Sequence, residues 1–250
     1  MAVAFRLPGT RAAGCLLIHG FTATPDEVLP LGQALSAAGY AAVGVQLAGH
    51  GTSVADLSRQ RWQDWAASVS AARAEMHHER VFVIGLSLGA LLGLHLAATA
   101  PQRSIAGLVC CSTPLRLQDR RLTALRGAYQ IPGLRRLGLT IPKGMRGISD
   151  PALRAQSQSY DAIPLTGLVE LLKLQDVITP LLPHITAPTL ILHARKDRTA
   201  PVANAAWLAQ ALTAAPVETM ILEHSWHVIT EDIERDEVAR AVIAFCARVG

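Results

Sequence analysis

A serine flanked by glycines is the clearest chemical feature of this sequence. Residues 85–89 read Gly-Leu-Ser-Leu-Gly, which matches the pattern G-x-S-x-G with Ser87 at its centre. The motif follows an apolar run at 81–86 and precedes a helix-like stretch at 88–100, so it predicts a strand, a tight turn and a helix. Such a turn exposes the serine hydroxyl at a helix N-terminus, where the helix dipole favours developing negative charge. Ser87 is therefore the candidate nucleophile, the alternative being an ordinary serine N-cap.

A serine hydroxyl is a weak nucleophile and needs a neighbouring base, usually a histidine held by a carboxylate. Two later strand-like runs end in residues of these kinds: Asp197 follows one, and Glu223, His224 and His227 follow the other. The order serine, acid, histidine is the one that this kind of nucleophile turn requires. Spacing alone does not choose between His227 and His224, or between Asp197 and Glu223. The His-x-x-His pair has no evident third ligand, which disfavours a metal site.

Acyl transfer from a serine also requires N–H donors for the tetrahedral oxyanion. The backbone N–H of Leu88, directly after the candidate nucleophile, is one expected donor. The second is the N–H of Phe21, in the His19-Gly20-Phe21-Thr22 turn that follows an apolar run. Gly20 would let the backbone approach a substrate carbonyl closely, and His19 is interpreted as a structural residue of that turn.

Short apolar runs alternate with helix-like segments along the chain, which is typical of a parallel sheet covered on both faces. Strands are predicted at 15–18, 41–47, 81–86, 105–111, 189–194 and 217–222. Helices are predicted at 25–38, 61–78, 88–100, 201–212 and 231–249. The fold class is therefore α/β, with a mostly parallel central sheet.

One long interval breaks this alternation. Between the runs at 105–111 and 189–194 the chain is rich in Pro and Gly, and a structureless loop of that length is improbable in a compact domain. We expect a helical cap inserted over the carboxyl ends of the strands. The predicted organisation is a core of 1–114 and 188–250 and a cap of 115–187.

Charge is concentrated in this interval. The chain has a net charge of +4, but residues 115–160 carry nine basic side chains against Asp119 and Asp150. The basic residues are Arg116, Arg120, Arg121, Arg126, Arg135, Arg136, Lys143, Arg146 and Arg154. A nucleic-acid surface would interleave them with aromatics, and only Tyr129 and Tyr160 are near. The segment is interpreted as a solvated basic face, with attraction to an anionic membrane surface or an acidic substrate as the alternative.

Composition and cysteine usage indicate the compartment. Half of the residues are hydrophobic and 17% are charged, which suits one globular domain with a large core. The sequence contains no run of about 18 apolar residues, the length that a membrane span needs. Arg6 and Pro8 interrupt the N-terminus where a signal peptide needs its apolar centre. Cysteines 15, 110, 111 and 246 follow no disulfide or metal spacing, so buried reduced thiols in a cytoplasmic protein are expected.

Several segments together resemble the bacterial carboxylesterases and monoacylglycerol lipases of the α/β-hydrolase superfamily. The matching segments are Leu-Leu-Ile-His-Gly-Phe-Thr at 16–22, Gly-His-Gly-Thr at 49–52, Trp-Gln-Asp-Trp at 62–65, the serine motif at 85–89, Asp197, and His-Val-Ile-Thr at 227–230. The resemblance implies that His227 is the base, Asp197 the acid, and the N–H groups of Phe21 and Leu88 the oxyanion donors. It also implies an acyl-enzyme mechanism without a metal or organic cofactor.

The function expected from these residues and the resemblance is that of a serine carboxylic-ester hydrolase acting on small esters with short- to medium-chain acyl groups. Activity should rise with pH as the catalytic histidine loses its proton. Five leucines of the cap could contact an aliphatic chain or simply form the packed face of a helix: Leu165, Leu168, Leu171, Leu172 and Leu174. Tyr160-Asp161 before Pro164 is similar to the family's late cap, so Asp161 is a candidate for binding the free hydroxyls of a monoacylglycerol.

Other activities on the same scaffold, and a binding role without catalysis, stay open from the sequence. Monoacylglycerol lipase, thioesterase, peptidase and carbon–carbon hydrolase activities all use the same scaffold and nucleophile. Dehalogenases and epoxide hydrolases are disfavoured, because they carry aspartate where this chain has Ser87. A binding module without catalysis is also possible on this fold, although the chain keeps the serine, the histidine and both glycines of the turn.

Overall fold

The computed structural model describes residues 4–101, 104–117, 120–129, 131, 133–144 and 147–250. Its centre is a seven-stranded sheet in the order β1-β3-β2-β4-β5-β8-β9. The strands are β1 (Phe5–Leu7), β2 (Gly14–Ile18), β3 (Ala42–Val45), β4 (Val81–Leu86), β5 (Ile105–Cys111), β8 (Thr189–Ala194) and β9 (Val217–Leu222). All pairs are parallel except that of the edge strand β1 with β3. The predicted α/β class with a mostly parallel sheet is confirmed.

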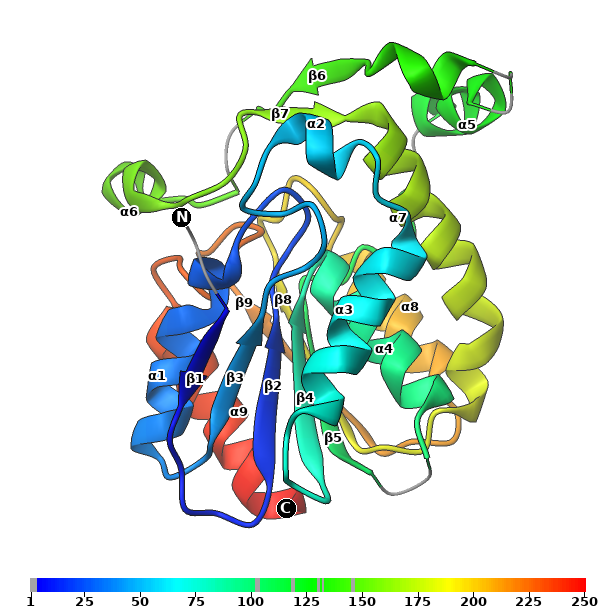
Figure 1. Ribbon diagram of the computed structural model, residues 1–250. Coiled ribbons are helices and arrows are strands. Elements are labelled where there is room, and N and C mark those ends of the chain that lie inside the picture. The colour runs from blue at the N-terminus through cyan, green and yellow to red at the C-terminus, as the bar shows by residue number, and fades with distance from the viewer. Residues whose placement is uncertain (1–3, 102–103, 118–119, 130, 132, 145–146) are drawn as a thin grey trace.

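Helices cover both faces of this sheet (Figure 1). On one face lie α1 (Leu29–Ala37), preceded by η1 (Pro25–Val28), and α9 (Arg235–Val249). On the other face lie α3 (Trp62–Ala74), α4 (Leu88–Thr99) and α8 (Ala203–Ala211), and the short α2 (Val54–Leu57) sits beyond the strand ends. Among the helices of the described ranges, none is both long and apolar enough to cross a bilayer.

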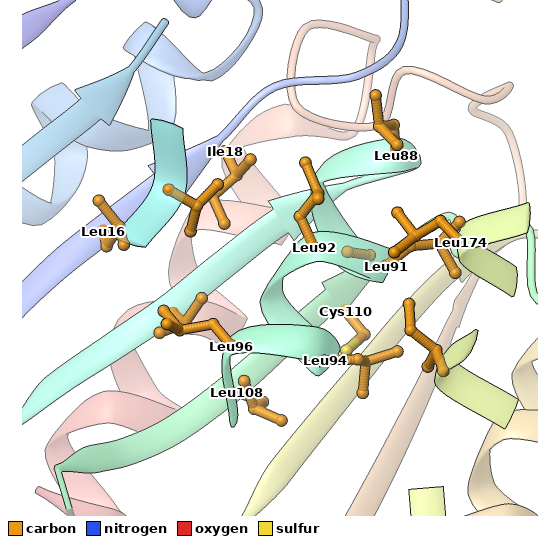
Figure 2. Packing of buried hydrophobic residues seen from close by; sticks show 14 of the residues in the cluster. Leu16, Ile18, Leu88, Leu91, Leu92, Leu94, Leu96, Leu108, Cys110 and Leu174 are labelled. Carbon is orange, nitrogen blue, oxygen red and sulfur yellow. The ribbon is translucent and has the colours of Figure 1, made fainter. Parts of the chain in front are cut away.

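The alternation of side chains along the strands explains why both faces need a helical layer. In β2, Cys15 and Leu17 belong to the core cluster beneath α1 and α9, whereas Leu16 and Ile18 belong to the cluster beneath α3 and α4. Figure 2 shows the second cluster, in which the leucines of α4 pack against the sheet and Leu174 approaches from a later helix. A strand buried on both faces is a continuous apolar run, and this makes it conspicuous in the sequence.

The differences from the prediction at β1 and α1 have identifiable reasons. β1 was not predicted, because it is a three-residue edge strand that is only partly buried. The helix predicted at 25–38 divides into the 3-10 turn η1 and the α-helix α1. Pro30 lies at the second position of α1, where its missing N–H interrupts a continuous α-helical ladder through 25–38.

The interval 115–187 contributes no strand to the central sheet within the described residues. It contains α5 (Arg120–Ala128), η2 (Leu134–Leu137), β6 (Thr140–Pro142), α6 (Pro151–Gln156), β7 (Ala162–Pro164), α7 (Leu165–Ile178) and η3 (Thr179–His184). The part from α5 to β7 lies beyond the carboxyl ends of the strands, and α7 runs down beside α3 and α4 (Figure 1). The antiparallel pair β6–β7 was not part of the predicted helical cap.

Candidate active site

The turn from β4 into α4 holds Ser87 in a strained conformation. Ser87 has a φ of 55°, a region that residues with a side chain rarely adopt, and its N–H donates to the Cys111 carbonyl at 2.9 Å. A Cβ at Gly85 would lie 2.2 Å from the Gly89 carbonyl oxygen, and one at Gly89 would lie 2.1 Å from the Ile18 carbonyl oxygen. Both glycines of the motif are therefore required by close backbone contacts.

Three of the predicted site residues meet at the carboxyl edge of the sheet. His227 Nε2 lies 2.9 Å from Ser87 Oγ, and His227 Nδ1 lies 2.7 Å from Asp197 Oδ2. Because an ionised carboxylate only accepts, Nδ1 carries the proton and Nε2 is left to accept from the Ser87 hydroxyl. Hydrogen bonds thus join Ser87, His227 and Asp197 in the order expected of a nucleophile, a base and an orienting acid.

The competing residues lie elsewhere. His224 is exposed, and its backbone N–H donates to Glu234 at 3.0 Å. Glu223 is also exposed and forms an ion pair with Arg195 at 2.5 Å. The geometry therefore joins His227, and not His224, to Ser87, and it joins Asp197, and not Glu223, to that histidine.

Asp197 is surrounded by donors. Its Oδ1 accepts from the N–H groups of Thr199 at 2.8 Å and Ala200 at 2.9 Å. Burial alone would raise the pKa of Asp197, but His227, His193 and the Ala200 N–H hold it well below its usual range. The carboxylate therefore stays ionised and available to orient His227.

His193 is a part of this site that the sequence did not reveal. It lies in β8, fully buried, with Nε2 at 3.0 Å from the Ala200 carbonyl oxygen and 3.3 Å from Asp197 Oδ2. A carbonyl oxygen only accepts, so Nε2 carries the proton and also faces the carboxylate as a donor. The only signal in the sequence was a histidine within an apolar strand, four positions before the acid.

The expected oxyanion donors, Phe21 and Leu88, follow the ends of the two neighbouring strands β2 and β4. Leu88 is the first residue of α4, so its N–H has no acceptor within the helix. Phe21 lies in a turn closed by the Ala23 N–H and the Gly20 carbonyl at 3.3 Å, with Thr22 at a φ of 66°. A non-glycine residue with positive φ beside a strained nucleophile is typical of a functional turn.

His19 fixes this turn to the core. Its Nδ1 lies 2.8 Å from the Gly20 carbonyl oxygen, and its Nε2 accepts from the Leu47 N–H at 3.3 Å. Burial lowers the pKa of His19 to about 4, although the hydrogen bond to Gly20 opposes this shift. The histidine is therefore neutral near pH 7 and bridges two loops, in agreement with its predicted structural role.

A cavity opens at Ser87 and His227 between the sheet and residues 115–187, which are called the inserted segment below. One part of its wall is apolar and is formed by Leu86, Pro114, Leu117, Ile163, Leu168, Leu171 and Val228. The other part is polar and is formed by Thr22, Glu27, Ser87, Lys143, Thr199 and His227. Of the five leucines, Leu168 and Leu171 line the cavity, and Leu171 and Leu174 belong to the core cluster.

Glu27 and Lys143 were not predicted as site residues. Glu27 is buried and accepts from the Gly20 N–H at 2.6 Å, and Lys143 Nζ donates to Thr22 Oγ1 at 2.8 Å. Burial, together with the neighbouring Glu231, raises the pKa of Glu27 to about 7, while Lys143 and the Gly20 N–H oppose the shift. Neither residue belongs to a recognisable motif: Glu27 contacts Gly20 seven positions away, and Lys143 contacts Thr22 from a distant part of the chain.

The loop that carries His227 is tied to the inserted segment. The buried carboxylate of Asp232 accepts from the Trp226 N–H at 2.7 Å, the Ser149 N–H at 2.9 Å and the Ser149 hydroxyl at 2.6 Å. The Val228 N–H also donates to the Gly147 carbonyl at 2.8 Å. Since these bonds flank His227 on both sides, they fix the position of its side chain relative to Ser87.

Asp161 is separate from the cavity wall. It is exposed just before β7, and its backbone carbonyl accepts from the Lys143 N–H at 2.8 Å. Its side chain is not among the groups that line the cavity. The role in hydroxyl binding inferred from the family resemblance therefore stays a prediction.

Several of the basic residues have partners within the protein. Arg126 binds Asp176, and Arg135 binds the buried Glu170, both through ion pairs. Arg154 lies over the Trp226 ring at 5.2 Å. Arg146 and Asp119 lie outside the described residues, as do the side chains of Arg120, Arg121 and Arg136. Part of the basic excess is therefore used to hold the inserted segment together.

The four cysteines are free and buried. Burial raises the pKa of the Cys110 thiol to about 12, and it raises the pKa of the Cys111 thiol further. A thiol of this kind is protonated near pH 7 and unreactive. Cys110 and Cys111 are therefore disfavoured as nucleophiles, in agreement with the expectation of buried reduced thiols.

Comparisons with known proteins agree with this architecture. The family described as serine aminopeptidase, S33, matches residues 9–234. The chain is 30% identical over 243 residues to a thermostable monoacylglycerol lipase of Bacillus sp. (strain H-257), covering 94% of this chain and 90% of the relative. It is 28% identical over 240 residues to a carboxylesterase of Bacillus subtilis (strain 168), covering 94% and 92%.

Solved structures give the same answer about the fold. A structure from the study of the metagenome-derived lipolytic enzymes LipS and LipT has a TM-score of 0.88 and 28% identity, covering 99% of this chain and 98% of the other. The monoacylglycerol lipase of Paleococcus ferrophilus has a TM-score of 0.84 at 19% identity, with both chains fully covered, and supports the fold alone.

The fold, together with a serine at the nucleophile turn, defines this protein as a hydrolase of the α/β-hydrolase fold. The chain belongs to the serine aminopeptidase S33 family. The resemblance to carboxylesterases and monoacylglycerol lipases that the motifs indicated is confirmed by relatives with those names.

The ties of Asp232 predict a large effect of its removal. Asp232→Ala leaves three N–H or O–H donors of Trp226 and Ser149 without their carboxylate, so the free energy of unfolding should fall by about 3 kcal/mol. Activity should also fall, because the loop that carries His227 loses its attachment. Urea unfolding of the variant, with initial rates of ester hydrolysis, measures both.

Asp236→Ala is the matched control, since this aspartate is exposed in the first turn of α9. Its loss should change the free energy of unfolding by less than about 1 kcal/mol. Equal unfolding midpoints for the two variants would contradict the proposed role of Asp232.

Proposed function

We propose that this protein is a serine carboxylic-ester hydrolase that acts through an acyl-enzyme. The observation that carries the proposal is the hydrogen-bonded chain Ser87–His227–Asp197, with 2.9 Å and 2.7 Å between its atoms, at the mouth of a largely apolar cavity. This is the arrangement that converts a serine hydroxyl into a nucleophile.

The mechanism follows from the positions of the groups. His227 Nε2 takes the Ser87 proton as Oγ attacks the ester carbonyl, and Asp197 stabilises the imidazolium that forms. The N–H groups of Phe21 and Leu88 donate to the oxyanion of the tetrahedral intermediate. The alcohol leaves with the proton from His227, and a water molecule, activated by the same histidine, hydrolyses the acyl-enzyme.

The apolar wall of the cavity favours an ester with an aliphatic acyl group. Leu117, Ile163, Leu168 and Leu171 offer such a chain a surface that excludes water. The family is named for an aminopeptidase and the same mechanism serves thioesters, but the named relatives that cover most of the chain are a carboxylesterase and a monoacylglycerol lipase. Esters are therefore the first substrate class to test.

A monoacylglycerol lipase is the second candidate function, favoured by the relative at 30% identity. The polar part of the cavity wall, with Glu27, Lys143 and Thr22, could accept an alcohol that carries hydroxyls. A binding module without catalysis is a poorer account, because the groups of the hydrogen-bonded chain are all present and aligned.

The nucleophile is tested by Ser87→Ala. Hydrolysis of p-nitrophenyl esters from acetate to palmitate should be measured for the wild type and the variant, beside monoacylglycerols. The wild type should prefer short to medium chains, and the variant should lose at least about a thousandfold in kcat while remaining folded. Full activity in the variant, or no turnover of any ester by the wild type, would overturn the esterase proposal.

Asp161→Ala tests the recognition of a glycerol headgroup. If Asp161 binds the free hydroxyls, kcat/KM should fall about tenfold for a monoacylglycerol and stay unchanged for a p-nitrophenyl ester of equal acyl length. An equal change for the two substrates would refute this role. Asp176, exposed on α7 and paired with Arg126, gives a control aspartate of the same inserted segment.

We also propose weak peripheral contact of the inserted segment with an anionic membrane surface. Four large apolar side chains of this segment are exposed, by 41 to 64%: Ile131, Leu137, Leu139 and Ile141. They lie within the basic residues 115–160. Apolar side chains beside excess positive charge are typical of interfacial binding.

Vesicle binding tests this contact through Leu137→Glu, with Ile233→Glu as a control because Ile233 is exposed by 51% outside the segment. The first variant should bind phosphatidylglycerol vesicles at least about threefold more weakly than the wild type, and the control should not. Added salt should weaken binding of the wild type. Equal binding of the wild type to neutral and anionic vesicles would contradict the proposal.

A further inference from the structure

A buried carboxylate lies directly behind the expected oxyanion turn. Glu27, in η1, has a relative exposure of 7%, lines the cavity beside Ser87, and accepts from the Gly20 N–H at 2.6 Å. A Cβ built on Gly20 would lie 2.9 Å from Glu27 Oε2 and 3.6 Å from the Ser87 Cβ. Gly20 is thus confined between the carboxylate and the nucleophile.

Hydrogen bonds to several backbone and side-chain groups hold the turn that contains Phe21. The Gly20 carbonyl is bound by His19, the Thr22 carbonyl accepts from the Tyr160 N–H at 2.9 Å, and the Thr22 hydroxyl accepts from Lys143. The Gly20 N–H is the part of the turn that Glu27 holds. The Gly20 carbonyl, held by His19, shares its peptide unit with the Phe21 N–H, and the Gly20 N–H, held by Glu27, belongs to the preceding peptide unit. Holding the peptide units on both sides of the Gly20 Cα restricts the rotation of Gly20 and thereby the direction of the Phe21 N–H.

We propose that Glu27 is a positioning residue of the oxyanion turn, whose carboxyl oxygen fixes the Gly20 N–H and thereby orients the Phe21 N–H toward the reacting carbonyl. The proposal rests on the function proposed above. It assigns to Glu27 an effect on the transition state and not on substrate binding, because the oxyanion exists only after attack.

Packing alone gives no reason for a carboxylate at this position. Burial and Glu231 disfavour its charge, with Lys143 opposing them. A leucine would fill a similar volume without a buried charge. The feature that leucine lacks is the acceptor for the Gly20 N–H, so the acceptor is the property to test.

The test compares Glu27→Leu with Glu27→Gln. The leucine variant keeps the volume and loses the acceptor, so kcat should fall by about tenfold or more while KM changes less than about twofold. The glutamine variant keeps a carbonyl acceptor and should retain kcat within about threefold of the wild type. A boronic acid that forms a tetrahedral adduct with Ser87 should bind the leucine variant more weakly by the same factor as kcat falls.

Three outcomes would overturn the proposal. They are an unchanged kcat in the leucine variant, a change confined to KM, and an equal loss of kcat in both variants. Asp26→Asn is the matched control, because this neighbouring carboxylate accepts from the Thr24 hydroxyl at 3.2 Å and not from the oxyanion turn. It should leave kcat unchanged.

A second measurement follows the contact between Glu27 and Gly20 in the wild-type protein by NMR. The Gly20 amide proton should move downfield in NMR spectra as Glu27 ionises between pH 5 and 9, because a carboxylate is a stronger acceptor than a carboxylic acid. Glu231, Lys143, Asp26 and His227 also surround this position and persist in Glu27→Gln, which should lack the Glu27-dependent shift. An identical titration of Gly20 in both proteins would overturn the proposal.

The two proposals fail separately. If the wild type hydrolyses no ester, the proposed function falls, while the Gly20 titration still reports on the contact with Glu27. If Ser87→Ala abolishes hydrolysis but Glu27→Leu keeps the wild-type kcat, the function stands and the positioning role is wrong.

Discussion

The close contact between α4 and the ends of β2 and β4 is the constraint on which the site depends. Gly85 pairs with Ile18 in the sheet, and Gly89 lies against the Ile18 carbonyl, with no room for a side chain at either glycine. This contact bends the chain sharply at Ser87 and brings Leu88, at the start of α4, near the turn that follows β2. This backbone contact therefore positions Ser87 and both expected oxyanion donors.

The other half of the site depends on the parallel sheet. Loops after parallel strands emerge at the same edge, so Asp197 after β8 and His227 after β9 can meet Ser87 after β4. Closeness alone does not set their orientation. Asp197 is fixed by two N–H groups and by His193, and the His227 loop is fixed by Asp232 and Gly147. The topology thus brings these residues together, and hydrogen bonds set their orientation.

The difference between what the sheet topology sets and what individual hydrogen bonds set explains how much could be predicted from the sequence. Strands buried on both faces were predicted with their observed bounds at 81–86, 105–111 and 189–194, because a continuous apolar run ends where burial ends. The bounds of the edge strand at 217–222 were also predicted, although this strand is only partly buried. The edge strand β1 and the break at Pro30 were missed, since neither alters such a run. Spacing could not distinguish His227 from His224, because the difference lies in long-range bonds. Lys143 had no motif for the same reason, since it binds Thr22 from a distant part of the chain. The contacts of Glu27 and His193 are short in sequence but follow no known motif.

The inserted segment completes both halves of the site at once. Lys143 and Tyr160 bind Thr22 in the oxyanion turn, while Gly147 and Ser149 bind the loop that carries His227. A displacement of this segment that broke these bonds would release the turn that contains Phe21 and the loop that carries His227 together. Access to the cavity and the alignment of the reacting groups are therefore linked by the same hydrogen bonds, and the charged network of Glu27, Lys143 and Glu231 lies where the two meet.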